Sequence, residues 1–279
     1  MPANAKTVLI TGAAGGIGAA ATRRLAQLGY TVYAGVRSPA PHLDGIDGVR
    51  TLRLDVTDAD DVREAAALVT AEMGSLHALV NNAGVIVQGP LELVPISELR
   101  RQFEVNVFGP AQVTAAFLPL LRAGRGRLVN MSAPTARAAV PFFGPISASK
   151  AALESLSDAL RGELAAWKIP ISVIEPSATD TPIFRTAEKT AAASLGTVPP
   201  ELLDLYASAL ASVTEAGAKM KLAPVDPVVA TIVRAVRSRR PKARYTVGRD
   251  AKAAAVLAKL PVGLRTSLVL RALGIKGVA

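Results

Sequence analysis

Three glycines near the N-terminus have the spacing of a phosphate-binding turn. They lie in the run TVLITGAAGGIGAAATRRLA, where an apolar segment passes through Gly12, Gly16 and Gly18 into an amphipathic one. Glycine allows the backbone to approach a pyrophosphate closely, and the free N–H groups at a helix start attract the anion. A glycine triplet alone is a weak signal, but its place at the first strand–helix junction favours a dinucleotide site over a ligand-free turn.

Metal and thiol chemistry are not expected. The chain has no cysteine and only two histidines, His42 and His77, which fall in a predicted loop and before a predicted strand. No local carboxylate cluster accompanies them, and a metal site needs several such ligands. We therefore predict no metal site and no disulfide.

The elements that must position the glycine turn alternate between strands and helices. Runs rich in β-branched residues predict strands at 7–11, 31–36, 49–54, 78–81, 127–131, 171–175 and 245–247. Helical patterns lie at 16–28, 58–73, 96–121, 147–167 and 226–239. This alternation is typical of βαβ units, so we predict an α/β fold with a doubly wound parallel sheet of the Rossmann type.

The length and the apolar content of 50% fit a single dinucleotide-binding domain over residues 1–250. The alternation breaks at 180–224, which is Ala-rich and contains Pro199 and Pro200. We interpret this stretch as a helical insertion that is either a lid over a ligand or a surface excursion without a role. Residues 251–279 are predicted to form a basic, apolar helical extension.

The net charge of +10 is unevenly distributed. Residues 1–233 carry 20 basic and 21 acidic side chains, whereas residues 234–279 carry 12 basic side chains and only Asp250. A balanced body argues against a nucleic-acid partner. The basic tail either packs on the domain as a solvated helical face or makes peripheral contact with an anionic membrane.

No apolar run reaches the roughly 18 residues of a membrane span. The start MPANAKTVLITG enters a predicted strand at once, without the pattern of a signal peptide. We therefore expect a cytoplasmic protein, and we expect it to be a homodimer or homotetramer.

The glycine spacing and four further segments resemble the short-chain dehydrogenase/reductase family. The glycine turn reads Thr-Gly-x-x-x-Gly-Ile-Gly, and the further segments are Leu54-Asp55-Val56, Asn81-Asn82-Ala83-Gly84, Asn106, and Pro176 with Thr181. They occur in the family's order and cover about residues 6–250. The run GPLELVPISELRRQFEVNVFG and the apolar, basic C-terminus look like the retinol and hydroxysteroid dehydrogenase branch.

The resemblance implies a nicotinamide dinucleotide and the residues that bind it. These are Gly12, Ala14, Gly16, Ile17, Gly18, Arg37, Asp55, Val56, Asn82, Ala83, Gly84, Lys150, Pro176 and Thr181. Arg37 stands where NAD-preferring relatives usually carry an acidic residue, and a guanidinium can bind a 2′-phosphate. The resemblance therefore implies NADP(H). NAD(H) is less favoured but open, because the glycine loop adds no basic residue or serine.

The resemblance also marks two catalytic positions that this chain fills with unreactive side chains. In the family a tyrosine exchanges the substrate proton, a lysine four residues later lowers its pKa, and a serine polarises the substrate oxygen. Lys150 is present, but Ile146 stands at the tyrosine position and Ala133 at the serine position. Neither side chain donates a hydrogen bond, so the family's proton relay cannot operate through them.

Four residues remain as catalytic candidates. Asn106 and Lys150 match family positions that also serve the cofactor ribose and the helix geometry around it. Ser132 neighbours Ala133, and Tyr206 lies in the insertion, from which it either reaches inward on closure or is a plain core or surface tyrosine.

We therefore predict an NADP(H)-dependent reductase of non-standard mechanism, which transfers hydride to an activated C=N or C=C bond of a small hydrophobic substrate. Hydride turns an iminium carbon into a neutral amine, and an enolate can take its proton from water, so neither reaction needs the missing acid. Two alternatives stay open: an inactive NADP(H)-binding pseudoenzyme, and a non-redox lyase or cyclase on the same scaffold.

Overall fold

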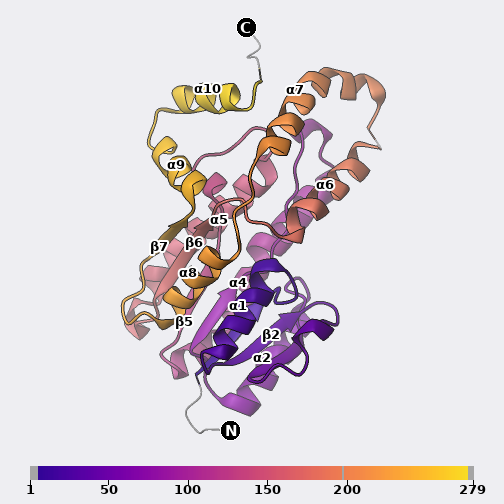
Figure 1. Cartoon of the computed structure of the whole chain (residues 1–279). Coiled ribbons are helices and arrows are strands. Elements are labelled where there is room, and N and C mark those ends of the chain that lie inside the picture. The colour runs from indigo at the N-terminus through magenta and orange to yellow at the C-terminus, as the bar shows by residue number, and fades with distance from the viewer. Residues whose placement is uncertain (1–5, 197, 276–279) are drawn as a thin grey trace.

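The computed structural model describes residues 6–196 and 198–275, and it contains one seven-stranded sheet (Figure 1). All neighbouring strands are parallel, in the order β3-β2-β1-β4-β5-β6-β7. The strands are β1 (Thr7–Thr11), β2 (Thr31–Val36), β3 (Val49–Arg53), β4 (Ala78–Asn81), β5 (Arg127–Met131), β6 (Ile171–Pro176) and β7 (Arg244–Val247). The predicted doubly wound parallel sheet is confirmed, with strand ends within one residue of those expected.

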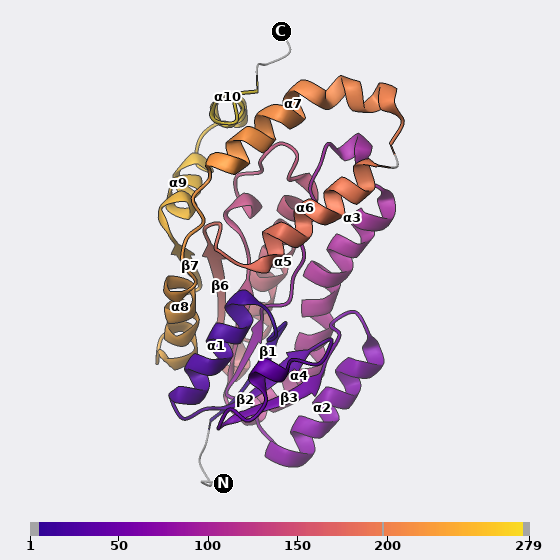
Figure 2. The same cartoon turned by 45° about the vertical axis from the view of Figure 1, so that its right-hand side comes forward.

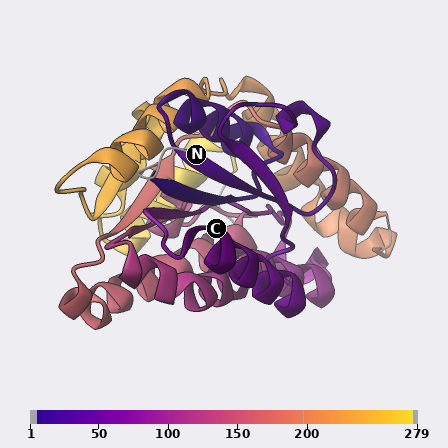
Figure 3. The same cartoon turned by 90° about the horizontal axis from the view of Figure 1, so that it is seen from below.

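Helices cover both faces of this sheet, as Figure 3 shows from below. They are α1 (Gly16–Gln27), α2 (Ala59–Met73), α3 (Ile96–Phe103), α4 (Gly109–Ala123), α5 (Gly144–Glu163), α6 (Pro182–Leu195), α7 (Pro200–Lys219), α8 (Asp226–Arg237), α9 (Arg249–Leu257) and α10 (Val262–Ala272). The α1 and α8 helices pack on one face, and α2, α4 and α5 lie on the other.

The central strand β1 shows why the strands read as continuous apolar runs. Val8 and Ile10 belong to the core under α1 and α8, whereas Leu9 belongs to the core under α2 and α4. All three side chains are fully buried. A parallel strand covered on both faces needs apolar residues at every position, so alternation is lost and the run itself becomes the signal.

The helix predicted at 96–121 is interrupted, and this is the main departure from the expected elements. The α3 helix ends at Phe103, a π-helical turn covers Glu104–Phe108, and α4 begins at Gly109. Pro110 has no backbone N–H, so it cannot donate to the carbonyl of Asn106 as a helix requires. Asn106 lies in this wider turn, and its side chain bonds to Val85 in the segment that follows β4.

The 180–224 insertion consists of α6 and α7, which lie above the sheet at the end where the strands finish (Figure 2). Its two ends are joined by a parallel bridge between Thr179 and Ala223, where the Asp180 N–H donates to the Ala223 carbonyl over 2.8 Å. Every residue of α7 is at least partly exposed. The insertion is therefore fixed at its base and lightly packed at its outer helix.

The C-terminal extension is helical over its described part and packs on the domain. Ala251 in α9 and Val269 in α10 are buried. The Arg265 guanidinium donates to the Arg137 carbonyl over 3.4 Å. Residues 276–279 of the predicted extension lie outside the described residues. Over residues 6–196 and 198–275, none of the helices combines the length and apolarity that crossing a bilayer requires.

His77, just before β4, gives a test of the packing at the start of the sheet. Its ring contacts the Val236 carbonyl at 3.2 Å, and burial together with the nearby Arg127 charge lowers the pKa of His77 to about 4. In the unfolded chain a histidine takes its proton near pH 6.5. As the pH falls from about 6.5 to 4, only the unfolded state is protonated, so the stability that is present above pH 6.5 is progressively lost.

We expect His77→Gln to reduce this loss. The measurement is the free energy of unfolding in urea at pH 7 and pH 5 for both proteins. The difference between the two pH values should be smaller in the variant, and an unchanged difference would contradict the packing of His77 described above.

Candidate dinucleotide and substrate site

The glycine turn lies at the carboxyl end of β1 and can be built only with glycine at two positions. Gly12 has a φ of +63°, and a Cβ there would lie 2.8 Å from the Cα of Ala83. A Cβ on Gly18 would lie 2.7 Å from the Asn82 amide nitrogen and against the Gly12 carbonyl. The turn is therefore pressed against the end of β4, and larger residues would push it away.

Asn82 holds the turn in this position. Its side-chain amide donates to the carbonyls of Thr11 and Gly12 at 3.0 and 3.1 Å. The Thr11 hydroxyl in turn accepts from the backbone N–H groups of Asn82 and Ala83 at 3.1 and 3.0 Å. Asn82 stays a predicted cofactor contact, and in this structure its side chain is bonded to the glycine turn.

The N-terminus of α1 faces open space in front of this turn. Its N-cap is Gly15, whose backbone is extended, and within the described residues no side chain caps the first N–H groups of the helix. A Cβ placed on Gly15 would have no neighbour within 4 Å. Uncapped N–H groups and the helix dipole together make this end of α1 suited to a phosphate.

Gly16, the next residue, lies directly against the insertion. A Cβ on Gly16 would lie 2.7 Å from the Cβ of Thr181, which is the N-cap residue of α6. Thr181 is almost completely buried, and its hydroxyl donates to the Thr179 carbonyl over 3.3 Å. The start of the insertion, at Thr181, therefore lies directly against the glycine turn.

Arg37 and Asp55 mark the other end of the candidate cofactor site, because each follows one of the paired strands β2 and β3. The Asp55 carboxylate accepts from the backbone N–H and the hydroxyl of Thr57 at 2.9 and 2.7 Å. Arg37 is exposed and, in the described part of the chain, forms no hydrogen bond or ion pair. Its guanidinium is therefore available to a ligand at this edge.

Asn106, in the π-helical turn, is fully buried and clamps the segment after β4. Its side-chain oxygen accepts from the Val85 N–H at 2.9 Å, and its amide nitrogen donates to the Val85 carbonyl at 3.0 Å. Both polar atoms of the Asn106 side chain are bonded to the backbone of Val85. Asn106 is therefore a positioning residue that fixes the backbone beside Gly84.

Lys150 on α5 brings a buried cation to the centre of the site. Its ammonium donates to the Met131 carbonyl over 2.7 Å, and a Cβ on Gly84 would lie 3.7 Å from its nitrogen. Burial lowers the pKa of Lys150 to about 8, although Glu154 partly opposes the shift. An ammonium has three N–H donors. One is used here, which leaves donors for a bound ligand.

Apolar side chains occupy the two positions predicted from the sequence to match the family's tyrosine and serine. Ile146 lies one helical turn before Lys150 on α5 and is 6% exposed. Ala133 follows β5 with an extended backbone and is partly exposed. Neither can exchange a proton, so Lys150 is the only ionisable group among these three residues.

Ser132 faces the other way, as expected for neighbours on an extended chain. Its buried hydroxyl donates to the Glu154 carboxylate over 2.6 Å. The structure therefore bonds this catalytic candidate to Glu154, and its role in catalysis stays a prediction.

The sequence did not predict the buried ionic cluster to which Ser132 is bound. Glu154 and Glu175 are both paired with Arg244, and Glu175 is also paired with Arg137 at 2.9 Å. Glu175 is fully buried, so these pairs are needed to neutralise its charge. Glu154 follows Lys150 by one helical turn, but its partner Arg244 is far away in the sequence and gives no local signal.

Tyr206 lies at the outer rim and does not reach inward. Its hydroxyl donates to the Glu92 carboxylate over 2.7 Å, at an exposed position, and this hydrogen bond raises the pKa of Tyr206. The catalytic role on closure of the insertion stays a prediction, and in this structure the Tyr206 hydroxyl is bonded at the rim. Tyr206 instead links α7 to the short turn Leu91–Leu93.

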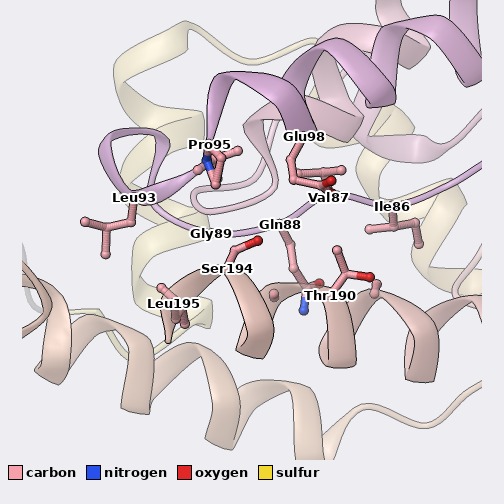
Figure 4. Close-up of a pocket in the computed structure, with 13 residues that line it drawn as sticks. Ile86, Val87, Gln88, Gly89, Leu93, Pro95, Glu98, Thr190, Ser194 and Leu195 are labelled. Carbon is pink, nitrogen blue, oxygen red and sulfur yellow. The ribbon is translucent and has the colours of Figure 1, made fainter. Parts of the chain in front are cut away.

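A small cavity separates α6 from the segment that follows β4 (Figure 4). Its volume is about 10 Å³, which is room for about one water molecule. The lining is mainly apolar, with Gln88 and Glu98 as polar residues on one side and Thr190 and Ser194 of α6 on the other (Figure 4). The insertion therefore rests on this segment and leaves a narrow, largely apolar space between them.

The family model described as short chain dehydrogenase matches residues 6–192. Human retinol dehydrogenase 5 is 34% identical over 266 residues, which cover 90% of this chain and 83% of that protein. This chain belongs to the short-chain dehydrogenase family. It is therefore an oxidoreductase, as its relatives are.

Two further comparisons bear on this member of the family. The 3-amino-tetrahydro-pyrrolizinone reductase of Xenorhabdus hominickii is 36% identical over 181 residues, which span 64% of this chain and 63% of that protein. A Burkholderia cenocepacia short-chain dehydrogenase in complex with NADP has a TM-score of 0.75 and 26% identity, with 97% of this chain and 99% of that chain covered. A short-chain dehydrogenase from Streptomyces avermitilis also has a TM-score of 0.75, with 31% identity and 91% coverage of both chains.

Proposed function

We propose that this protein is an NADP(H)-dependent reductase that adds hydride to an activated C=N or C=C bond of a small hydrophobic substrate. The observation that carries the proposal is the immediate surroundings of Lys150. A buried, incompletely bonded ammonium is retained there, while the side chains at 146 and 133 are isoleucine and alanine. A carbonyl reductase needs a proton donor at its substrate oxygen, and these two residues offer none.

The residues present fit a dinucleotide. The uncapped start of α1 suits the pyrophosphate, the spare donors of Lys150 suit ribose hydroxyls, and exposed Arg37 suits a 2′-phosphate. The Burkholderia cenocepacia neighbour in complex with NADP supports the same choice. When bound, the cofactor would supply the hydride.

The relative from Xenorhabdus hominickii supports a nitrogen heterocycle as substrate, because its name describes reduction of an amino-substituted pyrrolizinone. In this chain, Ile146 and Ala133 would present an apolar wall to such a ring, and the space under α6 is largely apolar as well. These side chains would exclude water from the reacting carbon. The positive charge of the Lys150 ammonium would act on the charge that the substrate carries or develops.

The test is NADPH consumption with a panel of cyclic imines, enones and ketones. We expect turnover of imines or enones and none of ketones. Strong reduction of ketones would overturn the proposal. Tight NADPH binding without consumption would support the inactive binding protein, and product formed without a net redox change would support a lyase or cyclase.

The charge on Lys150 separates the two substrate types. Its ammonium is present below a pH of about 8 and stabilises the enolate that forms from an enone. The same charge repels an N-alkyl iminium cation. At saturating NADPH, enone reduction should therefore fall as the pH rises through about 8, whereas iminium reduction should rise. Profiles of kcat against pH for one substrate of each type make the comparison, and parallel profiles would contradict this role of Lys150.

We expect NADPH to bind more tightly than NADH, and Arg37→Asp to remove or reverse the preference. A charge-assisted hydrogen bond contributes about 1.5–3 kcal/mol, or roughly 10- to 100-fold in affinity. Calorimetric titration of both dinucleotides measures the effect. Arg239→Asp is the matched control, because Arg239 is also exposed but lies in the loop before β7, at the opposite end of the sheet. Equal affinities for the two dinucleotides in the unmodified protein would contradict the prediction.

A further inference from the structure

The outer side of the C-terminal helices is unusually apolar for a protein surface. Val256 in α9 is 66% exposed, and Leu264 and Leu268 in α10 are 52% and 39% exposed. On α10 the buried contact is made by Val269, so the domain already covers the opposite side of the helix. The exposed leucines are therefore not part of the packing that fixes α10.

Helical spacing puts basic and apolar side chains on shared outer stripes. In α10, Leu264 and Leu268 are four residues apart, and Arg271 follows three residues later. In α9, Lys252 precedes Val256 by four residues, and exposed Lys259 lies in the turn just after the helix. Residues at these spacings lie on one side of a helix. We call these six residues the C-terminal outer face.

The charge of this segment is not balanced by its own residues. Residues 249–275 contain five basic side chains and one acidic side chain, Asp250. In the described part of the chain, none of the basic residues of the outer face forms an ion pair. A partner that complements this face therefore needs negative charge for its basic residues and an apolar region for its leucines and valine. A second copy of this chain would bring the same positive charge to the contact.

The outer face lies at the end of the molecule where the insertion closes over the strands (Figure 1). The α9 helix packs against the short turn Pro134–Ala136, which directly follows Ala133. The last described turn of the extension contacts α7, where the Ser212 hydroxyl donates to the Gly274 carbonyl over 3.4 Å. A surface bound here would lie beside the turn that follows Ala133 and beside the outer helix of the insertion.

We propose that the C-terminal outer face docks on the surface of an anionic lipid bilayer, with its leucines and valine among the acyl chains and its basic residues at the headgroups. This combination of an apolar stripe and flanking lysines and arginines is what an interfacial helix needs. Docking would bring the turn that follows Ala133 next to the lipid, which can hold a hydrophobic substrate.

The test is flotation of the full-length protein with vesicles of phosphatidylcholine, with and without phosphatidylserine. We expect binding to the phosphatidylserine vesicles, and affinity about tenfold or more weaker without that lipid or in about 0.5 M salt. Leu264→Ser with Leu268→Ser, and separately Lys252→Glu with Lys259→Glu, should each weaken binding by about tenfold or more.

Leu68→Ser is the matched control, because Leu68 is 44% exposed on α2, away from this face. It should bind vesicles like the unmodified protein. Thermal unfolding and NADPH affinity should be unchanged in all these variants, which separates lost docking from lost folding. Absence of vesicle binding, equal binding by all variants, or a leucine-dependent self-association in place of vesicle binding would each overturn the proposal. Binding to polyglutamate in preference to vesicles would indicate an acidic protein partner and would overturn it as well.

Discussion

Ile146→Tyr combined with Ala133→Ser is expected to raise NADPH-dependent ketone reduction by about 10²- to 10⁴-fold, the range that a positioned general acid contributes. The introduced phenol would lie one helical turn before the buried Lys150 ammonium. A nearby cation favours the phenolate and so lowers the pKa of a tyrosine toward the working pH. The introduced serine would add a second hydrogen-bond donor for the carbonyl oxygen of the ketone substrate. Reduction of imines or enones should fall, because a hydroxyl replaces part of an apolar wall.

NADPH oxidation by the unmodified and doubly substituted proteins, each with the same ketones, imines and enones, measures both changes. Ile146→Phe with Ala133→Ser is the matched control, because phenylalanine supplies the ring without the hydroxyl. Equal ketone reduction by the phenylalanine and tyrosine variants would show that shape and not proton transfer is responsible. Such a result would refute the argument that proton donation is what this site lacks.

Gly16→Val is expected to weaken NADPH binding by about a hundredfold or more, since the side chain would crowd the pyrophosphate position. Even a single Cβ at this position would lie 2.7 Å from the Cβ of Thr181. The insertion must then shift away from the glycine turn or the backbone of the turn must move. Either change disturbs the space in which the start of α1 meets the phosphates.

Gly162→Val is the matched control for this loss. Gly162 is exposed near the end of α5, outside the candidate dinucleotide site, and an added Cβ would have no neighbour within 4 Å. A fluorescence titration with NADPH measures the affinity of both variants. We expect the affinity of the control variant to stay close to that of the unmodified protein. Undiminished binding by Gly16→Val, with the fold intact by circular dichroism, would mean that the dinucleotide lies elsewhere.

The sequence by itself determined the fold class and the place of the glycine turn. Strands such as Thr7–Thr11 are buried on both faces, so their apolar runs are visible without any knowledge of partners. The turn at Gly12 demands a positive φ and a close approach to Ala83, and glycine is the residue that allows both. These features depend on local conformation, and local residue types are enough to predict them.

Only the tertiary structure decided what individual polar side chains do. Ser132 donates to Glu154, Asn82 holds the glycine turn, and Tyr206 bonds to Glu92 at the rim. In each case the side chain could serve several partners, and the choice depends on which distant segment the fold brings within hydrogen-bond distance. The pairing of buried Glu175 with Arg244 is of the same kind, because the two charges come together only when β6 and β7 lie side by side.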